Sequence, residues 1–74
     1  MPADKVILYA VTSSNIHSIG YDPQAQELHI QFTSGSYYIY RDVSLETYEA
    51  FRAAKSVGKY FMQNIRNIYE GVKS

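Results

Sequence analysis

The sequence predicts an α+β domain, in which an antiparallel meander of three or four strands is covered on one face by two C-terminal helices. Apolar and polar side chains alternate along the first half of the chain, which is typical of strands with one buried face. After Val43 the apolar spacing changes from two residues to about 3.6, which is typical of amphipathic helices. With 74 residues and no cysteine, the chain has room for one hydrophobic core without disulfides. We therefore expect residues 1–74 to form a single domain.

The first two predicted strands lie before the Asp22-Pro23 turn. Residues 6–11 are rich in β-branched and aromatic side chains, which indicates an added edge strand. Residues 15–22 place Ile19 and Tyr21 on the same face of a second strand. Ile16 is out of phase with these two residues, which indicates a β-bulge.

The next two predicted strands form a hairpin. Residues 27–32 alternate without fault between apolar and polar side chains, and residues 33–36 supply a turn that contains glycine. Residues 37–43 form the second strand of the hairpin, antiparallel to residues 27–32, with Tyr38 and Tyr40 on the face that meets the helices. We interpret these two tyrosines as core residues whose hydroxyl groups find partners at the rim.

The first predicted helix begins after Ser44. The serine hydroxyl is a good N-cap because it accepts a hydrogen bond from an otherwise unpaired amide. Tyr48, Phe51 and Ala54 follow at helical spacing and form the inner stripe of this helix.

The second predicted helix begins after Ser56, which is again a capping residue. Its outer face carries Lys59, Gln63 and Arg66, and Gly71 is its expected C-terminal stop. Tyr69 is expected at the edge of the inner face, which is formed by four apolar residues, Val57, Phe61, Ile65 and Ile68.

Charge is distributed unevenly along the chain, although seven Lys and Arg balance seven Asp and Glu. Residues 1–51 carry two cations and six carboxylates, a net charge of −4, whereas residues 52–74 carry five cations and one carboxylate, a net charge of +4. Zero net charge argues against a strongly basic protein that coats nucleic acid. The asymmetry instead favours a basic face for an acidic partner.

Catalysis is not expected. His17 and His29 are the only imidazole groups, cysteine is absent, and the sequence has neither a phosphate-binding glycine loop nor the spacing of metal ligands. We therefore predict a protein that is not an enzyme and needs no cofactor or metal.

The longest apolar run, residues 6–11, is too short to cross a membrane. We expect a cytoplasmic protein without a membrane partner.

Several short segments follow one another in the order of a known pattern. They include Ser13-Ser14, Ile19-Gly20-Tyr21-Asp22, Leu28-x-Ile30-x-Phe32, Tyr38-Ile39-Tyr40, Tyr48-x-x-Phe51 and Ser56-x-Gly58-x-Tyr60-Phe61. Together these segments resemble the KTSC domain over about residues 11–69. The resemblance implies a domain found at the C-terminus of some lysyl-tRNA synthetases and alone in small bacterial or phage proteins. The chain departs from the family pattern at Ser44, where proline is usual, and at Met62, where asparagine is usual.

The first functional hypothesis is a small module that binds RNA or a nucleoprotein through a basic helix face. The resemblance favours it, because the family is associated with an enzyme that charges tRNA. In this hypothesis four cations contact phosphates and one of two tyrosines stacks on a base. The candidate residues are Arg52, Lys55, Lys59 and Arg66 for the phosphates, and Tyr60 or Tyr37 for the base.

The second hypothesis is a protein-interaction module, including a phage-type regulator that docks on a large host complex such as RNA polymerase. The strand face opposite the helices would supply the contact area, together with an exposed sheet edge. The candidate residues are Tyr37, Ile39, Arg41 and His29, and we interpret His29 as a solvated histidine on this open face. The sequence leaves the choice between RNA and a protein partner open, and the oligomeric state also.

Overall fold

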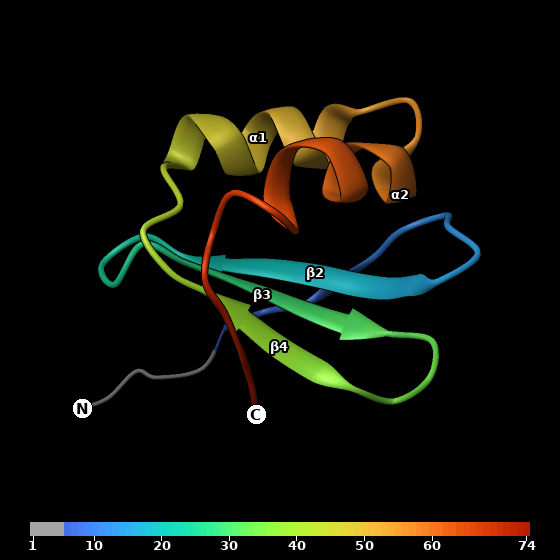
Figure 1. Ribbon diagram of the computed structural model, residues 1–74, viewed down its shortest axis with the longest axis horizontal. Coiled ribbons are helices and arrows are strands. Elements are labelled where there is room, and N and C mark those ends of the chain that lie inside the picture. The colour runs from blue at the N-terminus through green and yellow to red at the C-terminus, as the bar shows by residue number, and fades with distance from the viewer. Residues whose placement is uncertain (1–5) are drawn as a thin grey trace.

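A computed structural model describes residues 6–74 and shows one antiparallel sheet with its helices on one face (Figure 1). Five strands lie in sequence order across the sheet, so each strand pairs with its neighbour in the chain. The strands are β1 (Tyr9–Ala10), β2 (Ile16–Asp22), β3 (Glu27–Phe32), β4 (Tyr37–Tyr40) and β5 (Gly71–Lys73); the helices are α1 (Leu45–Ala53), α2 (Val57–Tyr60) and a π-helical segment, η1 (Phe61–Ile65). The predicted α+β class is confirmed, with β5 as an additional strand. None of the helices in residues 6–74 is long and apolar enough to span a bilayer.

The β2–β3 pair follows the sequence prediction closely. The register shifts between Ile16 and Ser18, which confirms the β-bulge. Because the bulge adds one residue to β2, Ile16 and Ile19 both face the core and are fully buried despite their odd spacing. The bounds of β3 are those predicted from its alternation.

The N-terminal strand is shorter than residues 6–11. Within residues 6–11, only Tyr9 and Ala10 form ladder pairs with β2. Residues 6–8 instead pack against Gly20, where a Cβ atom would lie 2.5 Å from the Ile7 carbonyl oxygen. Gly20 follows the core residue Ile19, so it faces away from the helices. Because Gly20 has no side chain, residues 6–8 can leave the sheet edge and cover part of the sheet face opposite the helices.

Strand β4 ends at Tyr40, and the predicted extent of residues 37–43 is too long. Asp42 has a φ of 59°, a left-handed conformation that a strand cannot contain. The chain turns there and places Val43, which is fully buried, under α1. The Tyr21 hydroxyl donates a hydrogen bond to the Val43 carbonyl, which holds this turn against β2.

Both predicted helix caps are confirmed. The Ser44 hydroxyl accepts a hydrogen bond from the Thr47 N–H at 3.2 Å, and the Ser56 hydroxyl accepts one from the Lys59 N–H at 3.2 Å. The side chains of Tyr48 and Phe51 are buried in α1, as the stripe predicts. Local side-chain chemistry therefore sets where each helix begins.

The second helix differs from the prediction at its C-terminal end. The Arg66 N–H donates to the Phe61 carbonyl, five residues back, so the last turn is π-helical and wider than an α-helical turn. The helix ends there, and the chain turns sharply enough for the Ile68 N–H to donate to the Ile65 carbonyl. Ile68 is consequently 63% exposed, and its predicted place on the inner face is wrong.

Gly71 does not stop the helix but begins β5. A Cβ atom at this position would overlap the ring of Tyr40, so only glycine lets β5 pair with β4 beneath that ring. The ring of Tyr40 also meets that of Phe61 edge to face, at 5.7 Å between centroids.

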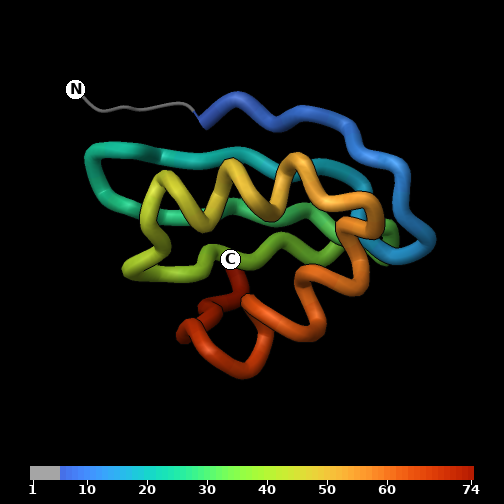
Figure 2. The backbone as a smooth tube through the Cα atoms, turned by 90° about the horizontal axis from the view of Figure 1, so that it is seen from above, coloured from blue at the N-terminus to red at the C-terminus, as the bar shows by residue number. Residues whose placement is uncertain are grey.

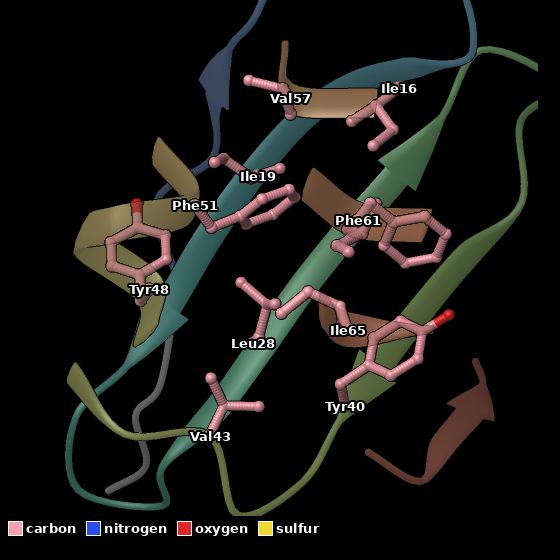
Figure 3. Packing of buried hydrophobic residues seen from close by; sticks show 11 residues of the cluster. Ile16, Ile19, Leu28, Tyr40, Val43, Tyr48, Phe51, Val57, Phe61 and Ile65 are labelled. Carbon is pink, nitrogen blue, oxygen red and sulfur yellow. The ribbon is translucent and has the colours of Figure 1, made fainter. Parts of the chain in front are cut away.

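The hydrophobic core lies between the sheet and the helices, and Figure 3 shows Phe51 beside Ile19 and the ring of Phe61 on the side of Tyr40. Figure 2 shows α1 lying over the strands, with α2 following at its end. Among residues 6–74, eleven buried residues form the core: Ile16, Ile19, Leu28, Ile30, Tyr40, Val43, Tyr48, Phe51, Val57, Phe61 and Ile65. Tyr38 packs against this cluster from the side and is half-buried, so Tyr38 and Tyr40 both face the helices as predicted.

Candidate functional site

Two adjoining pockets, each of about 330 Å³, lie along the second helix. Asn15 and Met62 line both pockets, and we therefore treat them as two halves of one groove. The hydroxyl half is lined by Thr12, Ser13, Ser14, Asn15, Ser56, Gly58, Lys59 and Met62. The aromatic half is lined by Asn15, Phe32, Tyr38, Tyr40, Phe61, Met62 and Arg66. The two volumes are at the lower end of the range for small-ligand sites.

The loop between β1 and β2 forms one wall of the hydroxyl half. The Ser13 hydroxyl accepts hydrogen bonds from the N–H groups of Ile16 at 3.3 Å and Asn15 at 3.4 Å, and donates one to Asn15 Oδ1 at 3.0 Å. The Thr33 N–H donates to the Asn15 carbonyl at 3.0 Å, which ties this loop to the β3–β4 hairpin turn. The position of Asn15 is therefore set by both neighbouring turns.

Gly58 forms the opposite wall of the hydroxyl half, in the first turn of α2. Among the described glycines only Gly35 has a positive φ, so Gly58 is not needed for its backbone conformation. Alanine would favour a helix by about 1 kcal/mol over glycine. A Cβ atom at Gly58, however, would lie 3.3 Å from both Ser13 Oγ and Asn15 Oδ1. Glycine at this position allows the loop to lie directly against the helix.

Four rings form the floor of the aromatic half. Phe32 meets Tyr38 and Phe61 edge to face, at 5.7 Å and 5.4 Å between centroids, and Tyr40 stacks on Tyr38 at 6.2 Å. Burial raises the pKa of Tyr40, the neighbouring Tyr38 raises it further, and Arg66 lowers it. Tyr40 therefore stays protonated and neutral near pH 7.

Each half of the groove has one cation at its wall. Lys59 lines the hydroxyl half and Arg66 the aromatic half, and both side chains are exposed. Arg66 Nη1 lies 3.4 Å from the sulfur of Met62, at the junction of the two halves. Among the described residues that line the groove there is no carboxylate, so the local charge favours an anionic ligand.

Comparison with known proteins agrees with this structure. The sequence model of the KTSC domain matches residues 12–69. The chain belongs to the KTSC domain family. It is 43% identical to an uncharacterised protein of Stutzerimonas stutzeri over 54 residues, which cover 73% of this chain and 76% of the relative. It is 42% identical to a protein of Tsukamurella paurometabola over 50 residues, which cover 68% of this chain and 75% of that protein.

A solved structure shows the same fold. The crystal structure of a KTSC domain protein from Yersinia pestis superposes with a TM-score of 0.91 and is 34% identical in sequence. The match covers 95% of this chain and 99% of that protein.

The groove of this KTSC domain contains only some of the cations predicted to contact RNA. Lys59 and Arg66 line it, whereas Lys55 is exposed beside α2 and is not among the lining residues. The guanidinium of Arg52 lies over the ring of Tyr9, 5.4 Å from its centroid, on a different part of the surface. This cation–π contact holds Arg52 toward β1, so Arg52 does not line the groove with Lys59 and Arg66.

Tyr60, one of the two tyrosines predicted to stack on a base, already makes a contact within the protein. Tyr60 is half-buried, with its ring 5.6 Å from that of Phe51, so it packs on the core beside α1.

Sequence reasoning missed the Ser13–Asn15 wall of the groove, although Ser13-Ser14 and Ser56-x-Gly58 both belong to the segments that carry the family resemblance. Their convergence on one site is the signal that could have found it.

The opposite face of the sheet contains the residues proposed for a protein partner. His29 Nδ1 lies 2.8 Å from the Tyr37 hydroxyl, and His29 Nε2 lies 3.7 Å from Glu27 Oε1. These neighbours leave the His29 side chain 12% exposed, so its interpretation as a solvated histidine is wrong. Burial also raises the pKa of Tyr37. Arg41 is exposed on the chain that follows β4.

An apolar strip remains open on that face. Ile39 on β4 is half-buried and pairs with Val72 on the edge strand β5, and Val72 is 41% exposed. The strip is narrow, because His29 lies on the other side of Ile39 in the same row.

Proposed function

We propose that this KTSC domain is a non-catalytic cytoplasmic module that binds single-stranded RNA in the groove along α2 and η1. The observation that supports the proposal is that Lys59 and Arg66 line adjoining halves of one groove that also contains aromatic rings. Proteins that bind single strands combine cations along the backbone with aromatic side chains that contact bases. Reducing conditions suit a chain without cysteine.

The two cations supply the contact with phosphates in this proposal. Both belong to residues 52–74, where five cations accompany one carboxylate. With a net charge of zero for the whole chain, we expect attraction for phosphates at the groove, where these two cations lie without a carboxylate in the described lining. We expect binding that is weak and local, over one or a few nucleotides.

The aromatic half supplies the contact with a base. Tyr38 is half-buried, lies at the edge of the core and lines the aromatic half together with Arg66. An aromatic ring at this position offers surface to a base, and the guanidinium of Arg66 offers a planar cation that stacks on bases.

Salt dependence tests the proposal. We expect mixed short RNAs to bind in a fluorescence anisotropy assay, and the logarithm of the affinity to fall with the logarithm of salt concentration. Two phosphate contacts predict a slope of about −1.4, at about −0.7 per contact for single strands. The absence of binding at low salt would contradict the proposal.

A protein-interaction module is the second candidate, and the exposed Val72 beside Ile39 supports it. An edge strand with an apolar neighbour is suited to a protein partner, such as a large complex like RNA polymerase. In this case a pull-down should recover the same protein with and without nuclease. Ile39→Asp should abolish that capture and leave RNA affinity unchanged.

A further inference from the structure

We infer that the hydroxyl half of the groove recognises the ribose of its ligand, so that this domain binds RNA in preference to DNA of the same sequence. This inference rests on the proposed function, because it specifies which nucleic acid the groove accepts. RNA differs from DNA at each nucleotide by one 2′-hydroxyl, a group that both donates and accepts hydrogen bonds.

The lining of the hydroxyl half matches a sugar better than a phosphate or a base. It contains four side-chain hydroxyl groups and one amide, whereas its single cation is Lys59. Neutral hydroxyl and amide groups complement the hydroxyl groups of a sugar, since each can donate or accept. The rings that suit a base lie in the neighbouring aromatic half. A nucleotide with its base in the aromatic half would therefore extend its ribose toward the hydroxyl half.

Asn15 is the residue best placed to read the 2′-hydroxyl. It lines both halves, so it lies where the sugar would join the base. Its Oδ1 accepts a hydrogen bond from the Ser13 hydroxyl at 3.0 Å. Within residues 6–74 its side-chain NH₂ has no hydrogen-bond partner, and both N–H groups remain free to donate to a ligand.

The wall around Asn15 is built to hold it in place. Ser13 orients the amide, Thr33 binds the Asn15 carbonyl, and Gly58 has no Cβ atom to crowd the Asn15 side chain. A residue that is preorganised in this way loses little freedom when it binds a ligand, which makes a hydrogen bond to it selective.

The test compares labelled RNA with DNA of the same sequence, using deoxyuridine in the DNA so that the bases are identical. We expect the unaltered protein to bind the RNA about fivefold more tightly, the usual effect of one hydrogen bond. RNA with 2′-O-methyl groups should bind as weakly as the DNA, because the methyl group blocks the approach of the 2′-oxygen to the Asn15 N–H groups. Equal affinity for RNA and DNA would overturn the inference and leave the proposed function intact, whereas binding of neither would overturn both.

Substitution of Asn15 tests whether this residue causes the preference for RNA over DNA. Asn15→Ala should reduce RNA affinity to that of DNA and leave DNA affinity unchanged, whereas the matched control Asn67→Ala, an exposed asparagine outside the groove lining, should change neither. An equal loss of RNA and DNA binding in Asn15→Ala would contradict the assignment of Asn15. If that variant fails to fold, Asn15→Asp keeps the acceptor for Ser13. Its added negative charge should weaken RNA and DNA binding alike, so the readout is the ratio of the two affinities, which should fall to about one.

Discussion

Replacing Tyr40 with alanine is expected to lower the free energy of unfolding by about 3–5 kcal/mol, as for other large aromatic residues in cores. The side chain is 6% exposed, its ring meets that of Phe61, and it covers the position where Gly71 lacks a side chain. The substitution therefore opens a cavity and removes the surface that holds β5 to the sheet. A domain of this size has only a few kcal/mol of net stability, so much of the population should unfold. Chemical denaturation followed by circular dichroism measures the change.

Two variants define the cause of that loss. Tyr40→Phe removes only the hydroxyl group and should cost far less, because the ring contacts remain. Tyr38→Ala should cost less than Tyr40→Ala, since Tyr38 is half-buried at the edge of the same cluster. Unchanged stability in Tyr40→Ala would show that the ring is not part of the core.

Reversing both groove cations, Lys59→Glu with Arg66→Glu, is expected to abolish RNA binding without unfolding the domain. Both side chains are exposed, so the core is untouched. Each reversal replaces an attraction of about 1 kcal/mol at 4 Å in water by a repulsion of the same size. The two reversals together should therefore weaken binding by roughly 100-fold to 1,000-fold in the anisotropy assay.

A matched control separates the groove from net charge alone. Arg41→Glu with Arg52→Glu changes the net charge by the same amount, but neither residue lines the groove. Arg52 lies against Tyr9, and Arg41 follows β4 on the exposed surface. This variant should retain most of its RNA affinity. If both double variants weakened RNA binding equally, RNA would be attracted by the overall charge of the protein and not by a defined site.

Local chemistry is what made most of the fold predictable from the sequence. The alternation of residues 27–32 specifies a strand by itself, and Ser44 and Ser56 specify helix starts through hydroxyl groups that act within one turn. The out-of-phase Ile16 predicted the bulge for the same reason, since its spacing from Ile19 is a local property.

Features that depend on distant contacts could not be predicted in this way. Strand β5 has three residues, too few for a period, and its start at Gly71 follows from the ring of Tyr40, far away in the sequence. The π-helical turn that exposes Ile68 has no signature in the side-chain spacing.

The groove shows the same division between local and distant information. The shared outer face of Lys59 and Arg66 was predicted from helical spacing, but the groove that both residues line was not, because its other walls come from distant segments. Asn15 and Gly58 meet only after the sheet and the second helix have packed together, so sequence reasoning did not find the hydroxyl half. The contact of Arg52 with Tyr9 likewise depends on where β1 lies.

Nuclear magnetic resonance of the ¹⁵N-labelled domain titrated with a short mixed-sequence RNA tests the central claim most directly. The chain is 8.5 kDa, small enough for every backbone amide to be followed. RNA binding in the groove predicts shifts that concentrate at Asn15, Gly58, Lys59, Met62 and Arg66 and leave the opposite face, with Tyr37 and Ile39, unchanged. An RNA that shifts no amide, or shifts centred on Tyr37 and Ile39, would contradict it.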